Sequence, residues 1–294
     1  MLPPDEPIQL GERENEHGRT VADVLGPLLQ PEALRGPILV VAAHPDDEVL
    51  GASWLLRHGP GCHVVHVTDG APRDASLRAP DAPHTREAYA RLREREALAA
   101  LALAGVPPNH LFSLGAADQE ATQHLVTLTQ CLVALLKALR PTLLVVHPYE
   151  GGHPDHDAAA FVSHAAVALM ARSGRTPPAL LEMTSYHRRQ EARVTGDFLP
   201  APDGRLVATV SFTEAEHAAK RRMLTCHASQ ARLLETFSVE QERYRAAPRY
   251  DFTRPPHKGT LQYETHEWRM TGTRWRELAR QALEELKLPE APWH

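Results

Sequence analysis

Histidine and aspartate side chains gather at two places in this sequence, and both have the composition of a metal site. The first is the tetrapeptide HPDD at residues 44–47, and the second is the run HPYEGGHPDHDAA at residues 147–159. The first cluster is crowded with acidic groups, because Asp46, Asp47 and Glu48 are consecutive. Carboxylates so close together repel one another, which indicates a bound positive charge.

The spacing inside the two clusters predicts which side chains hold the metal. His44 and Asp47 stand three residues apart at the start of a predicted helix, so both can face one point. His153 and His156 have the same spacing, which does not choose between them. Two histidines and one carboxylate with an open coordination position form the pattern of catalytic zinc, and iron would suit it too. We therefore predict a Zn²⁺ or Fe²⁺ site formed by His44, Asp47 and one of these histidines.

Only one of the two adjacent aspartates needs to bind the metal. We assign the other, Asp46, to proton transfer. Zinc lowers the pKa of a bound water to ~7, and a nearby carboxylate can then take the proton. These residue types together predict a metal-bound water with a carboxylate base beside it.

The clusters follow predicted strands, which explains how distant segments can meet. Continuous apolar runs predict strands that are buried on both faces of a parallel sheet. The predicted strands are 36–44, 62–70, 110–115 and 142–148, and the predicted helices are 45–58, 85–105 and 120–140. Strands that alternate with helices indicate a doubly wound, mostly parallel α/β sheet with helices on both faces. Ligands of such sheets bind beyond the carboxyl ends of the strands, where both clusters lie.

The remaining segments give weaker signals. Residues 1–35 are expected to form an N-terminal segment with a short helix that Pro31 interrupts, and 36–294 to form a single domain. This domain would have a core at 36–172 and a C-terminal α+β extension at 173–294. In the extension, the pattern predicts strands at 180–187 and 205–212 and helices at 213–237 and 273–287.

Composition excludes several classes of function. A formal net charge of −5 over 294 residues gives no basic surface for nucleic acid, and no cluster of Lys and Arg suggests a membrane surface. No segment is apolar enough to span a bilayer, and the polar amino terminus lacks a signal-peptide core. Three scattered cysteines argue against a thiolate zinc site. We expect a cytoplasmic protein with a small-molecule partner, and the sequence leaves a homo-oligomer open.

The motifs AHPDDE, TDGAPRDA and HPYEGGHPDHDA resemble the GlcNAc-phosphatidylinositol de-N-acetylase-like family, also called PIG-L or LmbE-like, over roughly residues 36–160. This resemblance implies a Rossmann-like fold and a zinc-dependent hydrolase that removes acetyl groups from amino sugars and related N-acyl compounds. It also implies that the zinc ligands are His44, Asp47 and His156, which selects His156 where spacing could not.

The resemblance further implies the roles of the remaining residues in the two clusters. Asp46 would be the general base. His153 would stabilise the oxyanion, in a protonated form, or protonate the leaving amine, and Asp155 would orient His153. Some members of the family carry a carbonyl-polarising tyrosine two residues before His153, where this chain has Gly151. Whether nearby Tyr149 takes that role is left open by the sequence.

Four further residues are candidates for substrate contacts. Arg93, aligned with the family through the AGV at 104–106, is expected to contact a substrate hydroxyl or phosphate. Asp69 would form a wall of the cleft or cap a turn, and Asp118 would bind a hydroxyl or cap the next helix. Arg73 lies in the loop after the second strand. For the arginines, the alternative is a solvated, ion-paired surface.

These features together predict an N-deacetylase that acts on an amino sugar or a related small N-acyl metabolite. One alternative is a metal-dependent hydrolase of another bond, such as a phosphate ester, although two-metal sites of that type usually need more carboxylates. Another is a non-catalytic sugar-binding module, which would be expected to keep the ligands and lose Asp46.

Overall fold

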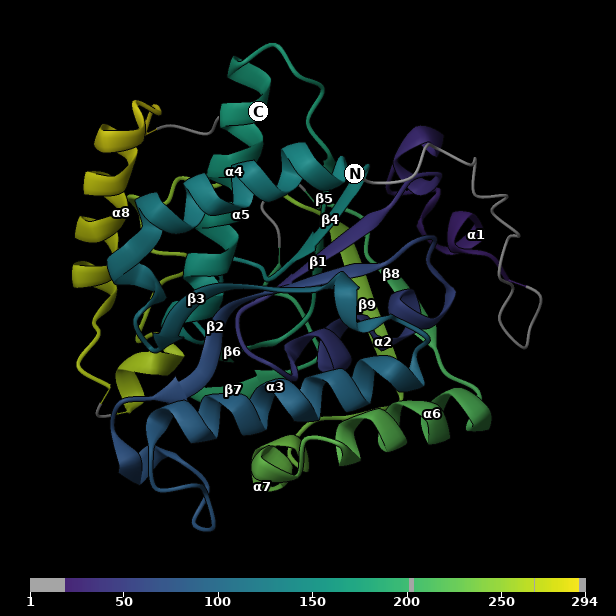
Figure 1. Cartoon of the computed structure of the whole chain (residues 1–294). Helices are drawn as coiled ribbons and strands as arrows, with labels where there is room; N and C mark the ends of the chain where they lie inside the picture. The colour runs from purple at the N-terminus through teal and green to yellow at the C-terminus, as the bar shows by residue number, and fades with distance from the viewer. Residues whose placement is uncertain (1–18, 201–203, 267, 291–294) are drawn as a thin grey trace, which may run out of the picture.

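A central seven-stranded sheet organises the chain (Figure 1). The computed structural model describes residues 19–200, 204–266 and 268–290. The strand order is β3-β2-β1-β4-β5-β9-β8, and the first five of these run parallel, as predicted. In this order the strands span Leu111–Asp118, His63–Pro72, Ile38–Ala42, Leu143–Val146, Ala179–Met183, Gln241–Ala246 and Ala208–Ser211. The predicted mixed α/β fold with a mostly parallel sheet is therefore confirmed.

Helices cover both faces of the sheet, and each face has its own apolar core. One core involves α4, α5 and α8, which lie together in Figure 1, and the other involves α1, α2, α3 and α6. These helices, α1 to α6 in order and then α8, span Val21–Leu25, Asp47–His58, Arg86–Leu103, Leu125–Leu139, Pro154–Arg172, Glu214–Thr225 and Gly272–Leu286. Among the described residues, no helix is both long and apolar enough to cross a membrane.

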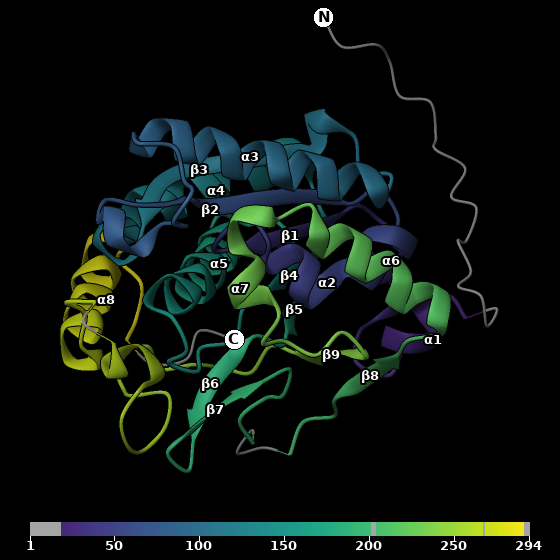
Figure 2. The same cartoon turned by 90° about the horizontal axis from the view of Figure 1, so that it is seen from below.

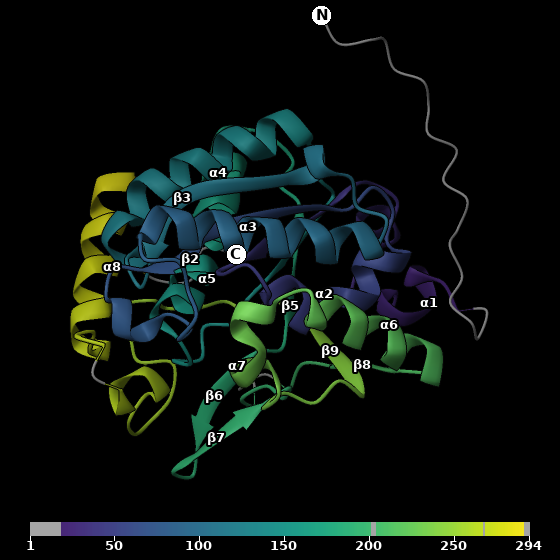
Figure 3. The same ribbon diagram turned by 60° about the horizontal axis from the view of Figure 1, so that its bottom comes forward.

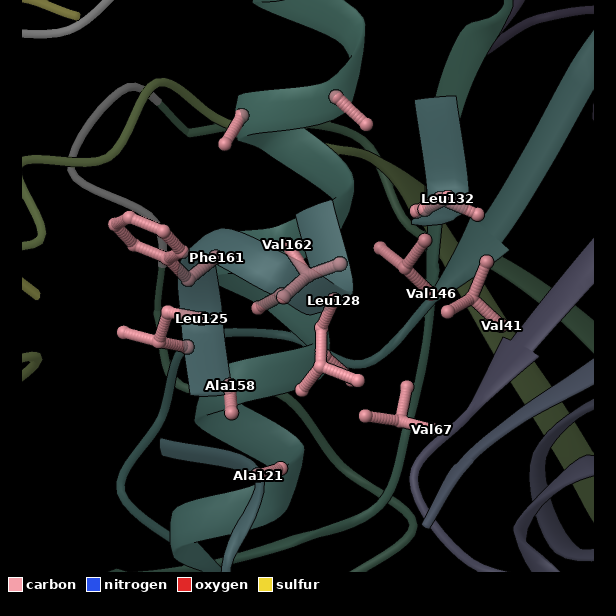
Figure 4. Packing of buried hydrophobic residues seen from close by; sticks show 14 of the residues in the cluster. Val41, Val67, Ala121, Leu125, Leu128, Leu132, Val146, Ala158, Phe161 and Val162 are labelled. Atoms are coloured by element: carbon pink, nitrogen blue, oxygen red, sulfur yellow. The ribbon is translucent and has the colours of Figure 1, made fainter. Parts of the chain in front are cut away.

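Successive side chains of the central strands point to opposite faces of the sheet, so one strand contributes to both apolar cores. In β1, Leu39 and Val41 enter one core while Ile38 and Val40 enter the other, and all four are fully buried. Figure 4 shows Val41 and Val146 packed near Leu132 of α4. Truncating such a side chain to alanine typically costs about 2–5 kcal/mol for a leucine or isoleucine. This packing fixes the strand ends that carry the two clusters.

The predictions for the C-terminal half were partly wrong. The predicted strand 180–187 is two strands, because the chain leaves the sheet after β5 and pairs β6 (Tyr186–Arg189) with β7 (Ala192–Thr195) in a separate hairpin. The predicted helix 213–237 breaks after Thr225, and its last part is the short helix α7 (Ala231–Leu234).

Strand β9 was missed because its sequence, QERYRA, is charged. The buried charges are satisfied by pairing: Glu242 accepts from Lys220 at 2.8 Å, and Arg245 donates to Glu182 at 2.6 Å. Paired charges can be buried where isolated ones cannot. The predicted extension, residues 173–294, therefore adds three strands, β5, β9 and β8, to one edge of the sheet.

The topology brings the two clusters together. Strands β1 and β4 are neighbours, with Val41 opposite Val146, so the segments that follow them emerge side by side. Figures 2 and 3 both place α7 beside the β6–β7 hairpin, although these elements are separated in the sequence. These C-terminal segments can therefore form one wall of the site that lies at the ends of β1 and β4.

Candidate active site

The first cluster turns sharply between β1 and α2. Asp46 precedes the first residue of α2 with φ at 138°, a left-handed region that costs a non-glycine residue about 1–3 kcal/mol. Its amide donates to Glu48 Oε2 at 3.0 Å. The amide of His44 donates to Asp47 Oδ2 at 2.8 Å, and His44 Nδ1 lies 3.2 Å from the same oxygen. The turn therefore presents His44, Asp46 and Asp47 together.

The second cluster is held by the start of α5. His153 caps this helix, since the amide of Asp155 donates to His153 Nδ1 at 3.1 Å. Glycine is required just before it: Gly151 has φ at +69°, and a Cβ on Gly152 would collide with the backbone oxygen of Tyr186. The glycine pair thus allows the β6 hairpin to approach the cluster closely.

The two clusters meet at Asp47. Its Oδ1 lies 3.3 Å from His156 Nε2, while its Oδ2 is near His44. Three overlapping groups of side chains place their ligand atoms within 4.8 Å of one another; they are His44, His153 and His156; His44, Asp118, His153 and Asp155; and Asp47, His147 and His156. His44 and His156 share the first group, and Asp47 and His156 share the third, so no one of these groups of described residues contains all three predicted ligands. His147 and Asp118 had not been predicted as ligands.

Hydrogen bonds distinguish the histidines. His147 Nε2 accepts from the amide of Ala43 at 3.1 Å, so its lone pair is already engaged. His156 has Nδ1 3.0 Å from the Ser185 hydroxyl, which can hold the Nδ1 proton and leave the Nε2 lone pair free. This pattern favours His156 over His147 as a ligand, and Ser185 is a supporting residue that sequence reasoning missed.

Buried negative charge dominates the pocket. His44 Nε2 lies 3.2 Å from a carboxylate oxygen of Asp118 and 3.2 Å from one of Asp155. Burial opposes protonation of His44, but these carboxylates raise its pKa well above the ordinary value. Asp118 Oδ1 is buried and makes no properly directed hydrogen bond in the described part of the chain. An excess of buried carboxylate of this kind suits a divalent cation.

The pKa values of the adjacent Asp46 and Asp47 carboxyl groups are shifted in opposite directions. Burial would raise the pKa of Asp47, but His156 and His147 hold it well below its ordinary value. Burial raises the pKa of Asp46 to about 8, even though the guanidinium of Arg93 opposes this shift. Asp47 is therefore the permanently ionised carboxylate, and Asp46 is the one that can exchange a proton near neutral pH.

His153 differs from its predicted state and partner. Burial, followed by the charge on His44, lowers the pKa of its imidazole to about 3, so it is neutral rather than protonated. The carboxylate of Asp155 is 4.0 Å from His153 Nδ1 and instead accepts the amides of Gln119 and Ala121. The backbone amide of Asp155, rather than its carboxylate, orients His153 and places the ring proton on Nε2.

Arg93 also differs from the expectation that it contacts substrate. It is only 3% exposed, and its guanidinium donates to the carbonyl of Pro45 at 2.6 Å and to that of Gly70 at 3.0 Å. It also donates to Asp46 Oδ2 at 3.0 Å. The side chain lines the pocket but is occupied by the protein, so it supports Asp46.

Of the other three candidates for substrate contacts, only Asp118 lines the pocket. Asp118 ends β3 inside the pocket and does not cap the next helix. Asp69 pairs with Arg86, and its carboxylate also accepts the amide of Ala71 in a turn. Arg73 is largely exposed and pairs with Glu120. Neither Asp69 nor Arg73 lines the pocket.

The pocket has a volume of about 250 Å³, and most of its outer wall was not predicted. It is lined by Tyr186 and Arg193 of the hairpin, by Phe237 after α7, and by His266 and Trp268. Position 186 follows a parallel strand, a signal that could have identified Tyr186. Arg193, which lies later in the same hairpin, has no comparable signal in the sequence.

The sequence left open whether Tyr149 takes the role of the tyrosine that is absent at position 151, and the structure separates Tyr149 from the pocket. Tyr149 faces away from the pocket: its hydroxyl donates to the carbonyl of Arg254 at 2.9 Å, and its ring packs on Trp275 and Phe252. Tyr186 instead lines the pocket, with its ring 5.2 Å from that of His156. Burial raises the pKa of the Tyr186 phenol, so it keeps its proton.

Comparison with known proteins gives a consistent result. Residues 39–167 match the family described as PIG-L: GlcNAc-PI de-N-acetylase. The chain is 29% identical over 242 residues to a 1D-myo-inositol 2-acetamido-2-deoxy-alpha-D-glucopyranoside deacetylase of Salinispora arenicola, an alignment that covers 66% of this chain and 75% of the relative. It is 31% identical over 191 residues to a protein described as deacetylase 1 for the same compound in Catenulispora acidiphila, covering 54% of this chain and 56% of that relative.

A solved structure shares the fold. The N,N'-diacetylchitobiose deacetylase from Pyrococcus horikoshii superposes with a TM-score of 0.51 at 21% identity, over 73% of this chain and 79% of that chain. At this level of identity the likeness concerns the fold alone.

Proposed function

We propose that this chain, whose residues 39–167 match the family described as PIG-L: GlcNAc-PI de-N-acetylase, is a metal-dependent hydrolase that removes an N-acetyl group from an amino sugar. One observation carries the proposal: Asp47 lies 3.2 Å from His44 and 3.3 Å from His156, and all three side chains line one pocket together with Asp46. The names of the Salinispora and Catenulispora relatives support the substrate class.

The donor set fits a zinc ion. Imidazole nitrogen and carboxylate oxygen are zinc ligands, and three protein ligands leave a position for water or substrate. When bound, the metal would activate water and polarise the acyl oxygen. The Ser185 hydroxyl beside His156 Nδ1 and the amide of His44 on Asp47 Oδ2 would hold the ligands in orientation.

Asp46 and His153 would perform the proton and charge chemistry. Asp46 takes the proton of the attacking water, since its carboxylate faces the pocket and Arg93 fixes it at 3.0 Å. His153 donates its Nε2–H to the acyl oxygen as negative charge develops there. A neutral donor suffices for this step, and removing one such donor typically costs about 2.7–4 kcal/mol in the transition state.

Tyr186 is a second candidate donor to the acyl oxygen. Its protonated phenol lies in the pocket beside His156, and no side-chain hydrogen bond engages it among the described residues. We therefore expect Tyr186, on β6, to polarise the acyl carbonyl in place of the tyrosine that some family members carry at the position of Gly151.

The test is amine release by the purified full chain. N-acetylglucosaminyl-inositol, N-acetylglucosamine and a phosphomonoester are incubated with protein that has been loaded with zinc or stripped of metal. Metal-dependent release of amine that disappears in Asp46→Asn, with metal content unchanged, supports the proposal. Phosphate release without amine release would overturn it in favour of an esterase.

A further inference from the structure

Glu48 contacts the proposed base from outside the pocket. Its side chain is fully buried and does not line the pocket. Its Oε2 accepts a hydrogen bond from the backbone amide of Asp46 at 3.0 Å, and Nε2 of His66 in β2 lies 3.1 Å from the same oxygen. Glu48 Oε1 makes no hydrogen bond among the described residues. Both contacts of this carboxylate therefore meet at the oxygen that holds Asp46.

The backbone of Asp46 needs such support. Residue 46 precedes α2 with φ at 138° and ψ at −28°, whereas the residue that caps a helix usually has an extended backbone. Thr85 and Thr213, which cap α3 and α6, are extended, with φ at −95° and −72°. An unfavourable conformation of a non-glycine residue persists only where neighbouring groups hold it. The turn at Asp46 therefore depends on the groups that bind it.

The contact between Glu48 and Asp46 differs from an ordinary helix cap. In a capping box, a glutamate three residues after the cap accepts the amide of the cap residue, and the cap side chain bonds in return, as Glu216 and Thr213 do in α6. Glu48 stands two residues after Asp46, and the Asp46 side chain makes no such return bond. The Asp46 carboxylate is held instead by Arg93 at 3.0 Å. The amide and the carboxylate of Asp46 are therefore held by different side chains.

His66 holds the Glu48 carboxylate in place. His66 stands opposite Ala42 in the pairing of β2 with β1, which brings its ring to the turn that follows β1. The residue is only 4% exposed, and its proton lies on Nε2 because a carboxylate only accepts hydrogen bonds. Thr68 of the same strand donates to the carbonyl of Ala43 at 2.9 Å. Strand β2 therefore fixes the turn at two points, one of them through Glu48.

We propose that Glu48 and His66 are positioning residues for the reaction: together they hold the backbone of Asp46 so that its carboxylate faces the pocket. The inference rests on the proposed deacetylase function, in which Asp46 takes the proton of the attacking water. Arg93 fixes the side chain of Asp46, whereas Glu48 fixes its backbone. Because a base must lie within hydrogen-bond reach of the proton that it takes, a small displacement of this turn lowers the rate.

Kinetics of Glu48 variants test the proposal on the zinc-loaded full chain. Glu48→Ala should lower kcat for release of amine from N-acetylglucosaminyl-inositol about 10- to 100-fold, with little change in KM. Glu48→Gln should recover much of this loss, because its amide oxygen can still accept from Asp46. The value of kcat is expressed per bound zinc, so that a loss of metal is not counted as a loss of rate. Equal kcat in wild type and Glu48→Ala, or no recovery in Glu48→Gln, would overturn the inference.

Glu242→Ala is the matched control. Glu242 is also buried and accepts amides of α2, from Ser53 and Trp54, but neither of these residues belongs to the turn. The control variant should lower the midpoint of thermal unfolding and leave kcat unchanged when kcat is measured well below that midpoint. A fall in kcat as large as that of Glu48→Ala would show that loosening α2 is sufficient, which contradicts a positioning role.

A double variant tests the part played by His66. His66→Phe keeps a buried ring and removes the hydrogen bond to Glu48, so kcat should fall by less than in Glu48→Ala. The combined variant should match Glu48→Ala alone, because His66 acts through Glu48. Losses that add, or wild-type kcat in His66→Phe, would refute the role of His66. His66→Phe also tests the inference if Glu48→Ala does not fold.

Hydrogen exchange at the amide of Asp46 separates this inference from the proposed function, since it needs no turnover. Exchange there should be about 10-fold faster in Glu48→Ala, whereas the amides of Ser53 and Trp54 should be unaffected. Faster exchange at Asp46 without amine release by wild type would support the positioning contact and count only against the deacetylase function. Unchanged exchange, together with amine release by wild type, would overturn the inference and leave the deacetylase function standing.

Discussion

The guanidinium of Arg93 and the carboxylate of Asp46 form a buried pair, with Nη2 3.0 Å from Oδ2. Both residues are less than 5% exposed. The same nitrogen donates to the carbonyl of Pro45, so one side chain holds both the backbone and the carboxylate of a turn whose φ is unfavourable. Arg93 is therefore a positioning residue for the proposed base.

This pair predicts the effect of Arg93→Gln on the pH profile. Loss of the positive charge should raise the pKa of Asp46 further, because Arg93 opposes the effect of burial more strongly than His44 does. Less of the carboxylate would be ionised at neutral pH, so the rising limb of the kcat profile should move to higher pH. We expect activity at pH 7 to fall about 10- to 100-fold.

Exposed Arg95 provides the control for that variant. Arg95→Gln should leave the profile unchanged. Because a broken buried pair costs about 3–5 kcal/mol, thermal unfolding must show that Arg93→Gln is still folded. A folded variant with an unshifted profile would contradict the positioning role.

A second prediction concerns metal affinity. His156→Gln should lose the metal, whereas His147→Gln should keep most of its affinity, since His147 Nε2 already accepts from Ala43. Ser185→Ala should weaken binding by about 10- to 100-fold through the orientation of His156. Competition with a chelator measures all three. Equal losses in the two histidine variants would show that His147 is also a ligand.

A third prediction separates the two tyrosines. Tyr186→Phe should lower kcat by about 10²–10³ with little change in KM, as expected for a donor used mainly in the transition state. Tyr149→Phe should leave kcat intact and lose about 1 kcal/mol of stability, the net value of its hydrogen bond to Arg254. If the kinetic effects were reversed, the assignment of Tyr186 would fail.

A fourth prediction concerns the link between β9 and α2. Glu242 accepts from Lys220 at 2.8 Å and from the amides of Ser53 and Trp54, just after the non-helical residue Ala52 that kinks α2. Glu242→Ala should cost about 3–5 kcal/mol in unfolding free energy, because it leaves a buried lysine unpaired.

The control for this variant lies two residues away. Glu240 is exposed, and Glu240→Ala should change stability by no more than about 0.5 kcal/mol. Chemical denaturation measures both variants. A loss below 1 kcal/mol for Glu242→Ala would show that Lys220 finds another partner.

The sequence predicted most reliably where one local signal decides the structure. Apolar runs such as ILVVA and LLVV can be satisfied only by burial on both faces, so β1 and β4 were predicted correctly. The spacing of His44 and Asp47 was enough to place both at one turn. Strand β9 was missed because its charges are stabilised by partners more than twenty residues away in the sequence.

The residues themselves therefore determined the sheet and the histidine and aspartate donors of the two clusters at its rim, since periodicity and donor type are local properties. Only the tertiary structure decided that Arg93 holds Asp46, that the amide of Asp155 orients His153, and that Tyr186 and Arg193 wall the pocket. These relationships depend on how distant segments pack against one another, and a hydrogen-bonding side chain does not reveal in the sequence which partner it will meet.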